Sequence, residues 1–308
     1  MGSRILVFGA GVIGSIFAGA LYKAGNDITL LARGERYNEL KEKGLMLKDV
    51  KTGNLEVFKI KCINTLCASD EYDFIIVAVQ NKQVDSVLPV LADNVSKNIV
   101  FVVNNPSGYE KYISAIGKER VLAGFPSAGG EKKDGVVTYF IGRGIARVMQ
   151  TTTFGEVDGQ ITERLKRLVS LFREAGFAVT YSKNMDAWQK THIAFVVPIA
   201  YALCRFNSNN YLLAKSGKTI KTMILAMREG FQAVKKNGNP VEPRKLLYHY
   251  LPLFLLVPYY KTVFSMKIAE YALAKHTITA KGEIDDLNAE FLSMYGKENL
   301  ASWNELCD

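Results

Sequence analysis

Short apolar runs alternate with longer mixed segments in the first half of the chain. The runs at residues 5–8, 27–31, 74–79 and 99–103 are rich in Ile and Val, and residues 12–23 have the pattern of a buried helix. Buried strands that alternate with helices are typical of a parallel sheet covered on both faces. The pattern therefore predicts an α/β fold with a doubly wound sheet.

Three more strands are expected before this alternation ends. Apolar runs at residues 136–141, 146–150 and 177–181 have the length of strands. A polar, charged helix is expected between the last two, at residues 161–175.

Long segments with the 3.6-residue period of a helix replace the strands in the second half. They cover residues 186–204, 219–236, 243–256 and 283–295. The sequence therefore predicts a C-terminal all-helical domain. We expect an α/β domain at residues 1–182 and the helical domain at residues 183–308.

Composition gives little support to a metal site. The chain has 308 residues, 48% of them hydrophobic and 22% charged, which is ordinary for a folded globular protein. Its three histidines lie far apart, and its four cysteines (Cys62, Cys67, Cys204 and Cys307) form no C-x-x-C pair. We therefore predict no metal and no disulfide framework. Reduced thiols favour a cytoplasmic location.

Charge and hydropathy argue against nucleic acid and membranes as partners. The formal net charge is +9, but the basic residues are scattered among acidic ones and form no run interleaved with aromatics. The apolar stretches at residues 192–203 and 246–264 are interrupted by prolines or charged residues, so neither offers a membrane span. The chain starts with a strand-like run rather than a secretory signal, which makes export unexpected.

A glycine-rich turn follows the first predicted strand. The run Ile5-Leu-Val-Phe8 leads into Gly9-Ala-Gly11-Val12-Ile13-Gly14, and a helix and a second strand follow. In such a motif the first glycine permits a tight turn, the second lets a pyrophosphate approach, and the third lets helix and strand pack closely. The helix N-terminus attracts the phosphate charge. The motif predicts a Rossmann-type dinucleotide site formed by Gly9, Gly11, Val12, Ile13 and Gly14, with a turn that binds no ligand as the alternative.

The residue after the second strand indicates which dinucleotide is bound. An enzyme that uses NAD usually places an acid there for the ribose hydroxyls, whereas this chain has Arg33 in Leu31-Ala-Arg33-Gly-Glu35-Arg36. A guanidinium pairs with a 2'-phosphate in fork geometry, and a carboxylate would repel it. Glu35 lies beyond the position that an NAD-selecting acid normally takes. We therefore predict NADP(H) as the cofactor.

Several motifs in this order resemble the ketopantoate reductase (2-dehydropantoate 2-reductase) family over almost the full length of the chain. They are Gly9-Ala-Gly-Val-Ile-Gly14, Leu31-Ala-Arg33-Gly, Asn104-Asn105-Pro-Ser-Gly108, Phe154-Gly-Glu-Val-Asp-Gly159, Trp188-Gln-Lys190 and Gly282-Glu283-Ile-Asp-Asp-Leu-Asn288. The resemblance implies a Rossmann domain joined to a helical domain, with NADPH and a 2-oxo acid meeting in the cleft.

The resemblance also implies roles for single residues. Lys190 matches the catalytic lysine, Glu283 the active-site glutamate, and Asn105 an asparagine beside nicotinamide and substrate. Ser265 resembles a serine that contacts the substrate, although its spacing to Glu283 is longer than usual. Gln80 stands where the family often has a lysine near the cofactor.

Each of these residues has a chemical role that fits a reductase, and each also has a simpler structural interpretation. An ammonium such as Lys190 stabilises the charge that forms on a ketone oxygen and then donates a proton. A carboxylate such as Glu283 could bind the substrate hydroxyl or hold the lysine, and Asn105 supplies both a donor and an acceptor. Alternatively, Lys190 is a solvated helix residue, Glu283 a first-turn acid and Asn105 a turn residue.

Two departures from the family concern the helix that carries the lysine. Ala194 and Pro198 lie at i+4 and i+8 from Lys190, where the family usually has asparagines. We expect them to form an apolar wall facing the substrate, which predicts that a more apolar 2-oxo acid is preferred to ketopantoate. Asn209, with Asn207 and Asn210 beside it, could supply replacement contacts.

The sequence therefore predicts an NADPH-dependent reductase of a small 2-oxo acid. A non-catalytic NADP-binding sensor on the same fold is the main alternative, and a DNA-binding protein suggested by charge alone lacks a recognition motif. The apolar segment at residues 246–264 either packs within the helical domain or forms a homodimer interface.

Overall fold

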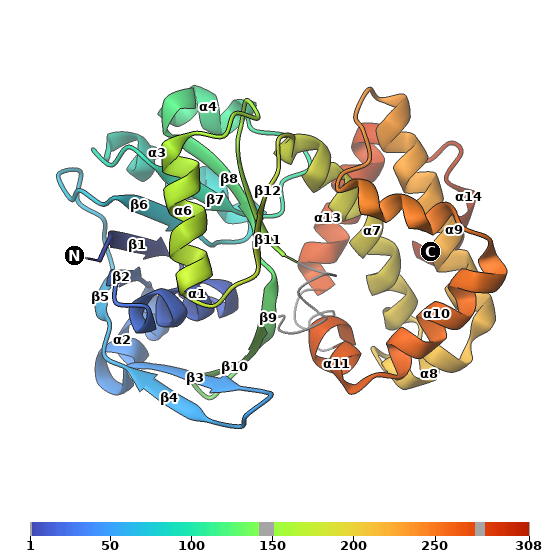
Figure 1. Ribbon diagram of the computed structural model, residues 1–308, viewed down its shortest axis with the longest axis horizontal. Helices are drawn as coiled ribbons and strands as arrows, with labels where there is room; N and C mark the ends of the chain where they lie inside the picture. Colours follow the sequence, from blue (N-terminus) through green and yellow to red (C-terminus); the bar gives the residue numbers. More distant parts are fainter. Residues whose placement is uncertain (1, 142–150, 275–280, 308) are drawn as a thin grey trace. The chain divides into compact units, whose positions relative to one another are not determined.

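The computed structural model describes residues 2–141, 151–274 and 281–307. The chain forms two compact units (Figure 1). Unit 1 contains residues 1–104 and 108–185, and unit 2 contains residues 105–107 and 186–308. The chain therefore enters unit 2 twice, first as a three-residue segment and then for the rest of its length.

Within the described ranges, unit 1 is built on an eight-stranded sheet in the order β12-β11-β8-β7-β6-β1-β2-β5. Only β8 and β11 are antiparallel neighbours there. The strands are β1 (Arg4–Phe8), β2 (Asp27–Leu31), β5 (Lys61–Ile63), β6 (Phe74–Val77), β7 (Ile99–Val102), β8 (Val121–Phe125), β11 (Thr152–Glu156) and β12 (Val179–Tyr181). The strand order runs outward from β1 in both directions, so the predicted doubly wound sheet is confirmed.

A second, four-stranded sheet, β4-β3-β10-β9, packs against α1 (Val12–Lys23). Its strands are β3 (Leu45–Asp49), β4 (Leu55–Phe58), β9 (Ala128–Lys133) and β10 (Val136–Ile141). The same helix contacts β1 and β2. Its Phe17 packs edge-on against Phe172 in the aromatic core, and its Gly19 leaves room for Leu47 of β3. The remaining helices of unit 1 are α2 (Gly34–Lys43), η1 (Asn81–Gln83), α3 (Val84–Asp93), α4 (Glu110–Ile116), η2 (Lys118–Arg120) and α6 (Glu163–Glu174).

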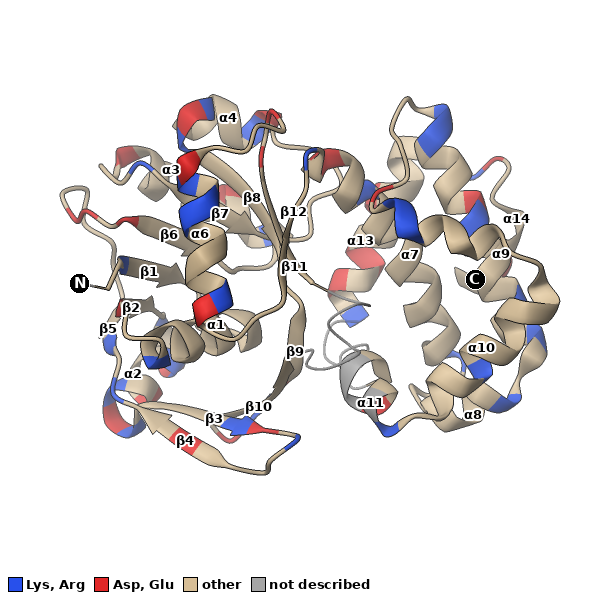
Figure 2. Ribbon diagram, viewed as in Figure 1, with Lys and Arg blue, Asp and Glu red and all other residues tan. Residues whose placement is uncertain are grey.

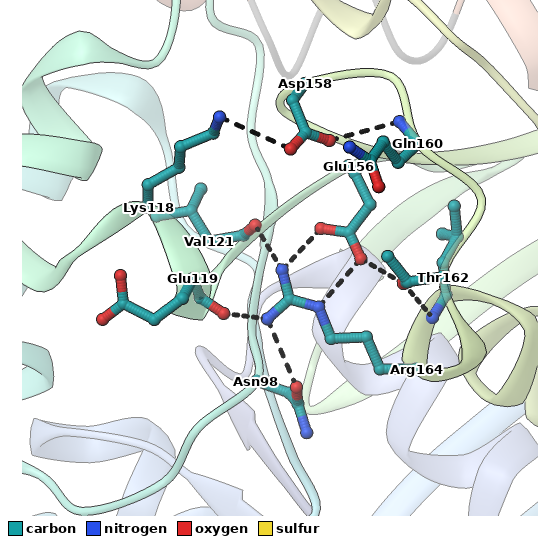
Figure 3. Close-up of polar contacts among 10 residues, drawn as sticks. Asn98, Lys118, Glu119, Val121, Glu156, Asp158, Gln160, Thr162 and Arg164 are labelled. Carbon is teal, nitrogen blue, oxygen red and sulfur yellow. Dashed lines mark hydrogen bonds and ion pairs between the residues drawn. The ribbon is translucent and has the colours of Figure 1, made fainter.

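A buried ion pair joins β11 to α6 (Figure 3). Glu156, 3% exposed, accepts from Arg164 Nε at 2.8 Å and from Nη2 at 2.5 Å. The Thr162 hydroxyl donates to Glu156 and accepts from the backbone N–H of Leu165, which caps α6. The guanidinium also donates to the carbonyl of Glu119. Because the buried charges have partners, they fix the start of α6 on the sheet.

Unit 2 is helical, as predicted. Its helices are α7 (Met185–Cys204), α8 (Asn210–Lys215), α9 (Gly217–Lys236), η3 (Arg244–Tyr250), α10 (Leu253–Ser265), α11 (Lys267–Ala269), the π-helix η4 (Glu270–Ala274), α13 (Lys281–Tyr295) and α14 (Ala301–Cys307). Trp303 of α14 is fully buried and stacks on Phe291 of α13 at 4.5 Å. Glu229 of α9 accepts the backbone N–H groups of Ser302 and Trp303, which fixes the last helix against α9.

Some predicted elements differ from the structure. The single helix expected at residues 243–256 is wrong, because the 3-10 helix η3 ends at Tyr250 and α10 begins at Leu253. Pro252 lacks an N–H group and favours the extended conformation that Leu251 adopts, so it interrupts the helix. The strand expected at residues 146–150 lies outside the described residues. Strands β3, β4, β5, β8, β9 and β11 were not predicted.

Basic and acidic residues are scattered along the helices of both units (Figure 2). Among the described helices, none is both long and apolar enough to cross a membrane.

Candidate active site

The glycine-rich turn lies at the switch point of the sheet. It follows β1, whose neighbours β2 and β6 continue the sheet in opposite directions. Gly9 has a φ of +113°, and a Cβ there would lie 2.5 Å from the carbonyl oxygen of Ala78. A Cβ on Gly14 would lie 1.9 Å from the carbonyl oxygen of Gly9. Both positions therefore require glycine for reasons within the protein itself.

Gly11 is different, because a Cβ built there would meet nothing within 4 Å. The residue is exposed and is the N-cap of α1. Val12 and Ile13, partly buried against the core, form the first turn of this helix. The first N–H groups of a helix lack partners within the helix and attract anions. The open space at Gly11 therefore fits a phosphate group approaching the start of α1.

Two arginines near the end of β2 have different environments. Arg36 donates to the carbonyl oxygen of Ala10 at 3.3 Å, to Glu39 at 2.6 Å and to the hydroxyl of Ser15 at 3.3 Å. Only 11% of its side chain is exposed, so it holds the glycine-rich turn against α2. Arg33, the N-cap of α2, is exposed and forms no hydrogen bond or ion pair with the described part of the chain. Its guanidinium is free to bind a ligand, whereas that of Arg36 is engaged. This difference was not predicted from the sequence, although the i, i+3 spacing of Arg36 and Glu39 signals an ion pair.

Gln80 lies near the glycine-rich turn. It follows β6, and the backbone N–H of Ala78 donates to the carbonyl oxygen of Phe8 at 2.9 Å, which fixes this edge beside the end of β1. Gln80 is exposed and is the N-cap of η1, where its backbone N–H donates to Gln83 Oε1 at 3.1 Å.

Asn105 belongs to unit 2, where it lies against α7. It is 4% exposed, and its backbone N–H donates to Oε1 of the fully buried Gln189 at 3.4 Å. Ser107 of the same short segment donates to Glu290 of α13. The segment at residues 105–107 therefore touches both α7 and α13, and Gln189 precedes the predicted catalytic lysine.

Lys190 forms an ion pair on α7. Its Nζ lies 2.5 Å from Asp186 Oδ2, one helical turn away. The lysine side chain is 14% exposed and that of Asp186 is 35% exposed. Asp186 was not predicted as a site residue, although acids at i−4 commonly pair with lysines in helices.

Glu283 lies in the first turn of α13 and is partly buried. Two contacts locate this turn: Ile284 packs on Ala200, and the Tyr201 hydroxyl donates to Asp285 at 2.8 Å. Tyr201 is eleven residues from Lys190 on α7, which is about 16 Å at the rise of an α-helix. The structure therefore places Glu283 near the far end of α7 and brings Asp186 to Lys190 instead. The role of Glu283 stays a prediction.

Ser265 and Asn209 lie close together in unit 2. The buried Asn210 amide donates to the carbonyl oxygen of Phe264 at 2.8 Å, which joins the start of α8 to the end of α10. Both residues are exposed and already hydrogen-bonded: Ser265 donates to the carbonyl oxygen of Lys261 at 2.8 Å, and Asn209 accepts from the N–H of Leu212 at 3.0 Å. Asn209 thereby caps α8.

The expected apolar wall at Ala194 is wrong. Ala194 is fully buried, and a Cβ on Gly230 of α9 would lie 2.9 Å from both the Ala194 Cβ and the ring of Trp303. Pro198 is buried too. Ala194 is small because α7 and α9 approach closely there. Its lack of a polar group is therefore explained by packing within unit 2.

Comparison with known proteins places this architecture in a family. The doubly wound sheet with a glycine turn at its switch point is Rossmann-type in class. Residues 5–159 match the family model described as ketopantoate reductase PanE/ApbA. The chain therefore belongs to this family of oxidoreductases, and the resemblance identified from its motifs is confirmed.

Individual relatives are distant. The 2-dehydropantoate 2-reductase of Archaeoglobus fulgidus is 26% identical over 245 residues, which are 78% of this chain and 74% of that protein. A ternary structure of D-mandelate dehydrogenase with NADH and anilino(oxo)acetate has a TM-score of 0.76 at 17% identity, covering 98% of this chain and 96% of that one. The 2-dehydropantoate 2-reductase of Geobacter metallireducens also has a TM-score of 0.76 at 17% identity, covering 99% of this chain and 97% of that one. At this identity the structural likeness establishes the fold.

Proposed function

We propose that the protein is an NADPH-dependent reductase that reduces the keto group of a small 2-oxo acid, either ketopantoate or a related acid. The observation that carries this proposal is the glycine-rich turn at the switch point, with open space at Gly11 and the unengaged guanidinium of Arg33, in a chain of the ketopantoate reductase family.

The residues of this turn fit the cofactor. A pyrophosphate at Gly11 would accept from the first N–H groups of α1, and Arg33 would pair with the 2'-phosphate of the adenosine ribose. Gln80, beside the end of β1, completes the proposed cofactor site. When bound, the cofactor supplies the hydride.

Lys190 supplies the proton in this proposal. The Nζ group has three N–H donors, of which one bonds Asp186, so two are available to the substrate. They stabilise the negative charge on the substrate oxygen as hydride arrives at carbon, and one proton then passes from Nζ to that oxygen. Asn105, beside α7, is proposed to orient the carbonyl group. The substrate contacts of Glu283, Ser265 and Asn209 stay predictions from the family resemblance.

The experiment is to follow NADPH oxidation with ketopantoate and with unbranched, branched and aromatic 2-oxo acids. We expect turnover of at least one acid, and a parallel series with NADH is needed because the D-mandelate dehydrogenase of the same fold was solved with that dinucleotide. Lys190→Ala should lower kcat by about 10² to 10⁴, as loss of a general acid does, with NADPH affinity nearly unchanged. Tight NADPH binding without turnover of any acid would contradict the proposal and support the non-catalytic sensor.

The same proposal includes a homodimer formed through η3 and α10. Their outer side chains are apolar and exposed: Leu251 by 48%, Phe254 by 75% and Leu255 by 50%. A large apolar side chain presents about 150–250 Å² when fully exposed, so these three leave about 300 Å² of apolar surface. This would form the centre of a standard interface, which buries about 800 Å² per partner. Light scattering of Phe254→Ser should show a monomer where the wild type is a dimer, and a monomeric wild type contradicts this part.

We also propose a cytoplasmic location. None of the four cysteines forms a disulfide within the described residues, which suits a reducing compartment.

A further inference from the structure

Three polar side chains meet where the start of α7 lies against the end of α13. The two helices run antiparallel: Tyr201 near the end of α7 bonds Asp285 at the start of α13, and the segment at residues 105–107 links Gln189 of α7 to Glu290 of α13. Tyr295, the last residue of α13, therefore lies near the first turn of α7, where Asp186 pairs with Lys190. Since 86% of the lysine side chain is shielded from solvent (14% exposed), water screens this ion pair less than a surface pair.

Asp186 and Tyr295 each have an oxygen that is still without a partner. Asp186 Oδ1 and the Tyr295 hydroxyl are both buried and accept or donate no hydrogen bond within the described parts of the chain. Burial raises the pKa of Tyr295 to about 12, and the negative charge of Asp186 adds to this shift. Tyr295 is therefore a neutral donor and Asp186 Oδ1 an acceptor, and both lose free energy while unpaired.

We propose that Asp186 is a positioning residue for Lys190, and that Tyr295 holds the carboxylate from the side of α13. The inference rests on the catalytic role proposed for Lys190. With Oδ2 bonded to Nζ and Oδ1 available to the tyrosine hydroxyl, the carboxylate fixes the ammonium in one place. Glu283, which chemistry had offered as a holder for the lysine, lies at the opposite end of α7.

The pairing of Asp186 with Lys190 also concerns the proton that Nζ donates to the substrate. Each turnover transfers one proton from Nζ to the substrate oxygen, and water must return one proton to the neutral amine. The carboxylate of Asp186, 2.5 Å from Nζ, holds the nitrogen in place for that return. It keeps only one of the three N–H donors occupied, which leaves the others for substrate.

The test compares Asp186→Asn with Asp186→Glu and Tyr295→Phe. We expect Asp186→Asn to lower kcat roughly tenfold to a hundredfold, less than loss of the acid itself, with KM for the 2-oxo acid changed by less than about threefold. Asp186→Glu keeps the charge and should recover most of kcat, and Tyr295→Phe should lower it severalfold. If Lys190 needs only a neighbour of the same shape, Asp186→Asn should be more active than Asp186→Glu. That result would overturn the proposal.

A chemical readout separates this inference from the proposed function. An amine-selective acylating reagent reaches Nζ more readily when no ion pair holds it, and mass spectrometry reports the rate at each lysine. Asp186→Asn should accelerate labelling of Lys190 severalfold at neutral pH. The control is Glu163→Gln on α6, which removes the partner of Lys166 at 2.6 Å and should leave labelling of Lys190 unchanged. Unchanged labelling of Lys190 in Asp186→Asn overturns the positioning role. Accelerated labelling in a protein that reduces no 2-oxo acid still supports the pairing and contradicts only the proposed reaction.

Discussion

The glycines of the turn after β1 are required for three different reasons. Gly9 adopts a positive φ that side chains disfavour, and Gly14 lies where a Cβ would collide with the carbonyl oxygen of Gly9. Gly11 has ordinary backbone angles, with φ of −71°, and open space around it. Nothing near Gly11 in the described part of unit 1 requires a glycine there, which suits the pyrophosphate proposed at this position.

This difference predicts opposite effects of two alanine substitutions. Gly14→Ala should destabilise the fold by about 1–3 kcal/mol through overpacking. Gly11→Ala should change the free energy of unfolding by less than about 1 kcal/mol and yet weaken NADPH binding, because its methyl group occupies space proposed for pyrophosphate. Urea unfolding and NADPH titration measure the two effects. Wild-type NADPH affinity in Gly11→Ala would show that the pyrophosphate does not lie there.

Arg33 predicts the choice of dinucleotide. Charge-assisted hydrogen bonds contribute about 1.5–3 kcal/mol, so Arg33→Ala should weaken NADPH binding roughly tenfold to a hundredfold. NADH lacks the 2'-phosphate, so its affinity should hardly change, and this makes it the internal control. Dissociation constants for both cofactors, measured by fluorescence titration, check the assignment. A variant that still prefers NADPH as strongly as the wild type would refute it.

At the scale of elements, the sequence predicts those whose pattern is local. The strands of the parallel sheet are continuous apolar runs, so β1, β2, β6 and β7 could be recognised from their residues alone. The strands β3 and β4 are short, β4 is largely exposed, and β3 pairs with β10, which is far away in the sequence, so no local pattern shows this sheet.

The residues of the candidate site also fall into two groups: those that a local pattern predicts and those whose surroundings depend on distant parts of the chain. The turn at Gly9–Gly14 and Arg33 follow from strand, glycine and helix order. The partner of Lys190 does not follow from a family motif, although the acid four residues earlier was visible on the same helix face. The environment of Ala194 depends on Gly230 and Trp303, which are far away in the sequence. Spacing on one helix places two residues on the same face but does not say what that face contacts.

The packing of α7 on α9 predicts that Ala194→Asn damages the fold. The larger side chain would enter the space shared with Gly230 and Trp303 and bring an amide without partners into the core. Overpacking costs about 1–3 kcal/mol, and an unpaired buried polar group costs about as much again. Thermal unfolding should show a marked loss of stability, with Ala194→Ser as the smaller control. If Ala194→Asn is as stable as the wild type and binds a 2-oxo acid better, Ala194 faces the substrate after all.

For the whole molecule, we expect acidic pH to lower the free energy of unfolding by more than the rise in net charge alone would. The formal charge of +9 at pH 7 rises as carboxylates are protonated, which increases repulsion in the compact state. A second contribution comes from His249 of η3, which is fully buried among aromatic side chains of unit 2. Its Nδ1 lies 2.8 Å from the carbonyl oxygen of Leu246, and its Nε2 lies 2.6 Å from the hydroxyl of Tyr260. A neutral ring satisfies both contacts, with Nδ1–H donating and Nε2 accepting.

Burial lowers the pKa of His249 from 6.5 to about 4, and the charge of Arg228 acts in the same direction, against the hydrogen bond to Leu246. Between these two pKa values the unfolded chain binds more protons than the folded one, so this stabilisation is complete above pH 6.5 and is lost as the pH falls toward 4. The loss amounts to at most about 3 kcal/mol.

His249→Gln keeps a donor and an acceptor but does not titrate. It should be less stable than the wild type at pH 7, and its free energy of unfolding should fall less steeply on acidification. Urea unfolding at several pH values measures both slopes. Equal slopes would mean that His249 is protonated in the folded protein as readily as in the unfolded chain, and the acid sensitivity would then come from the carboxylates and the net charge alone.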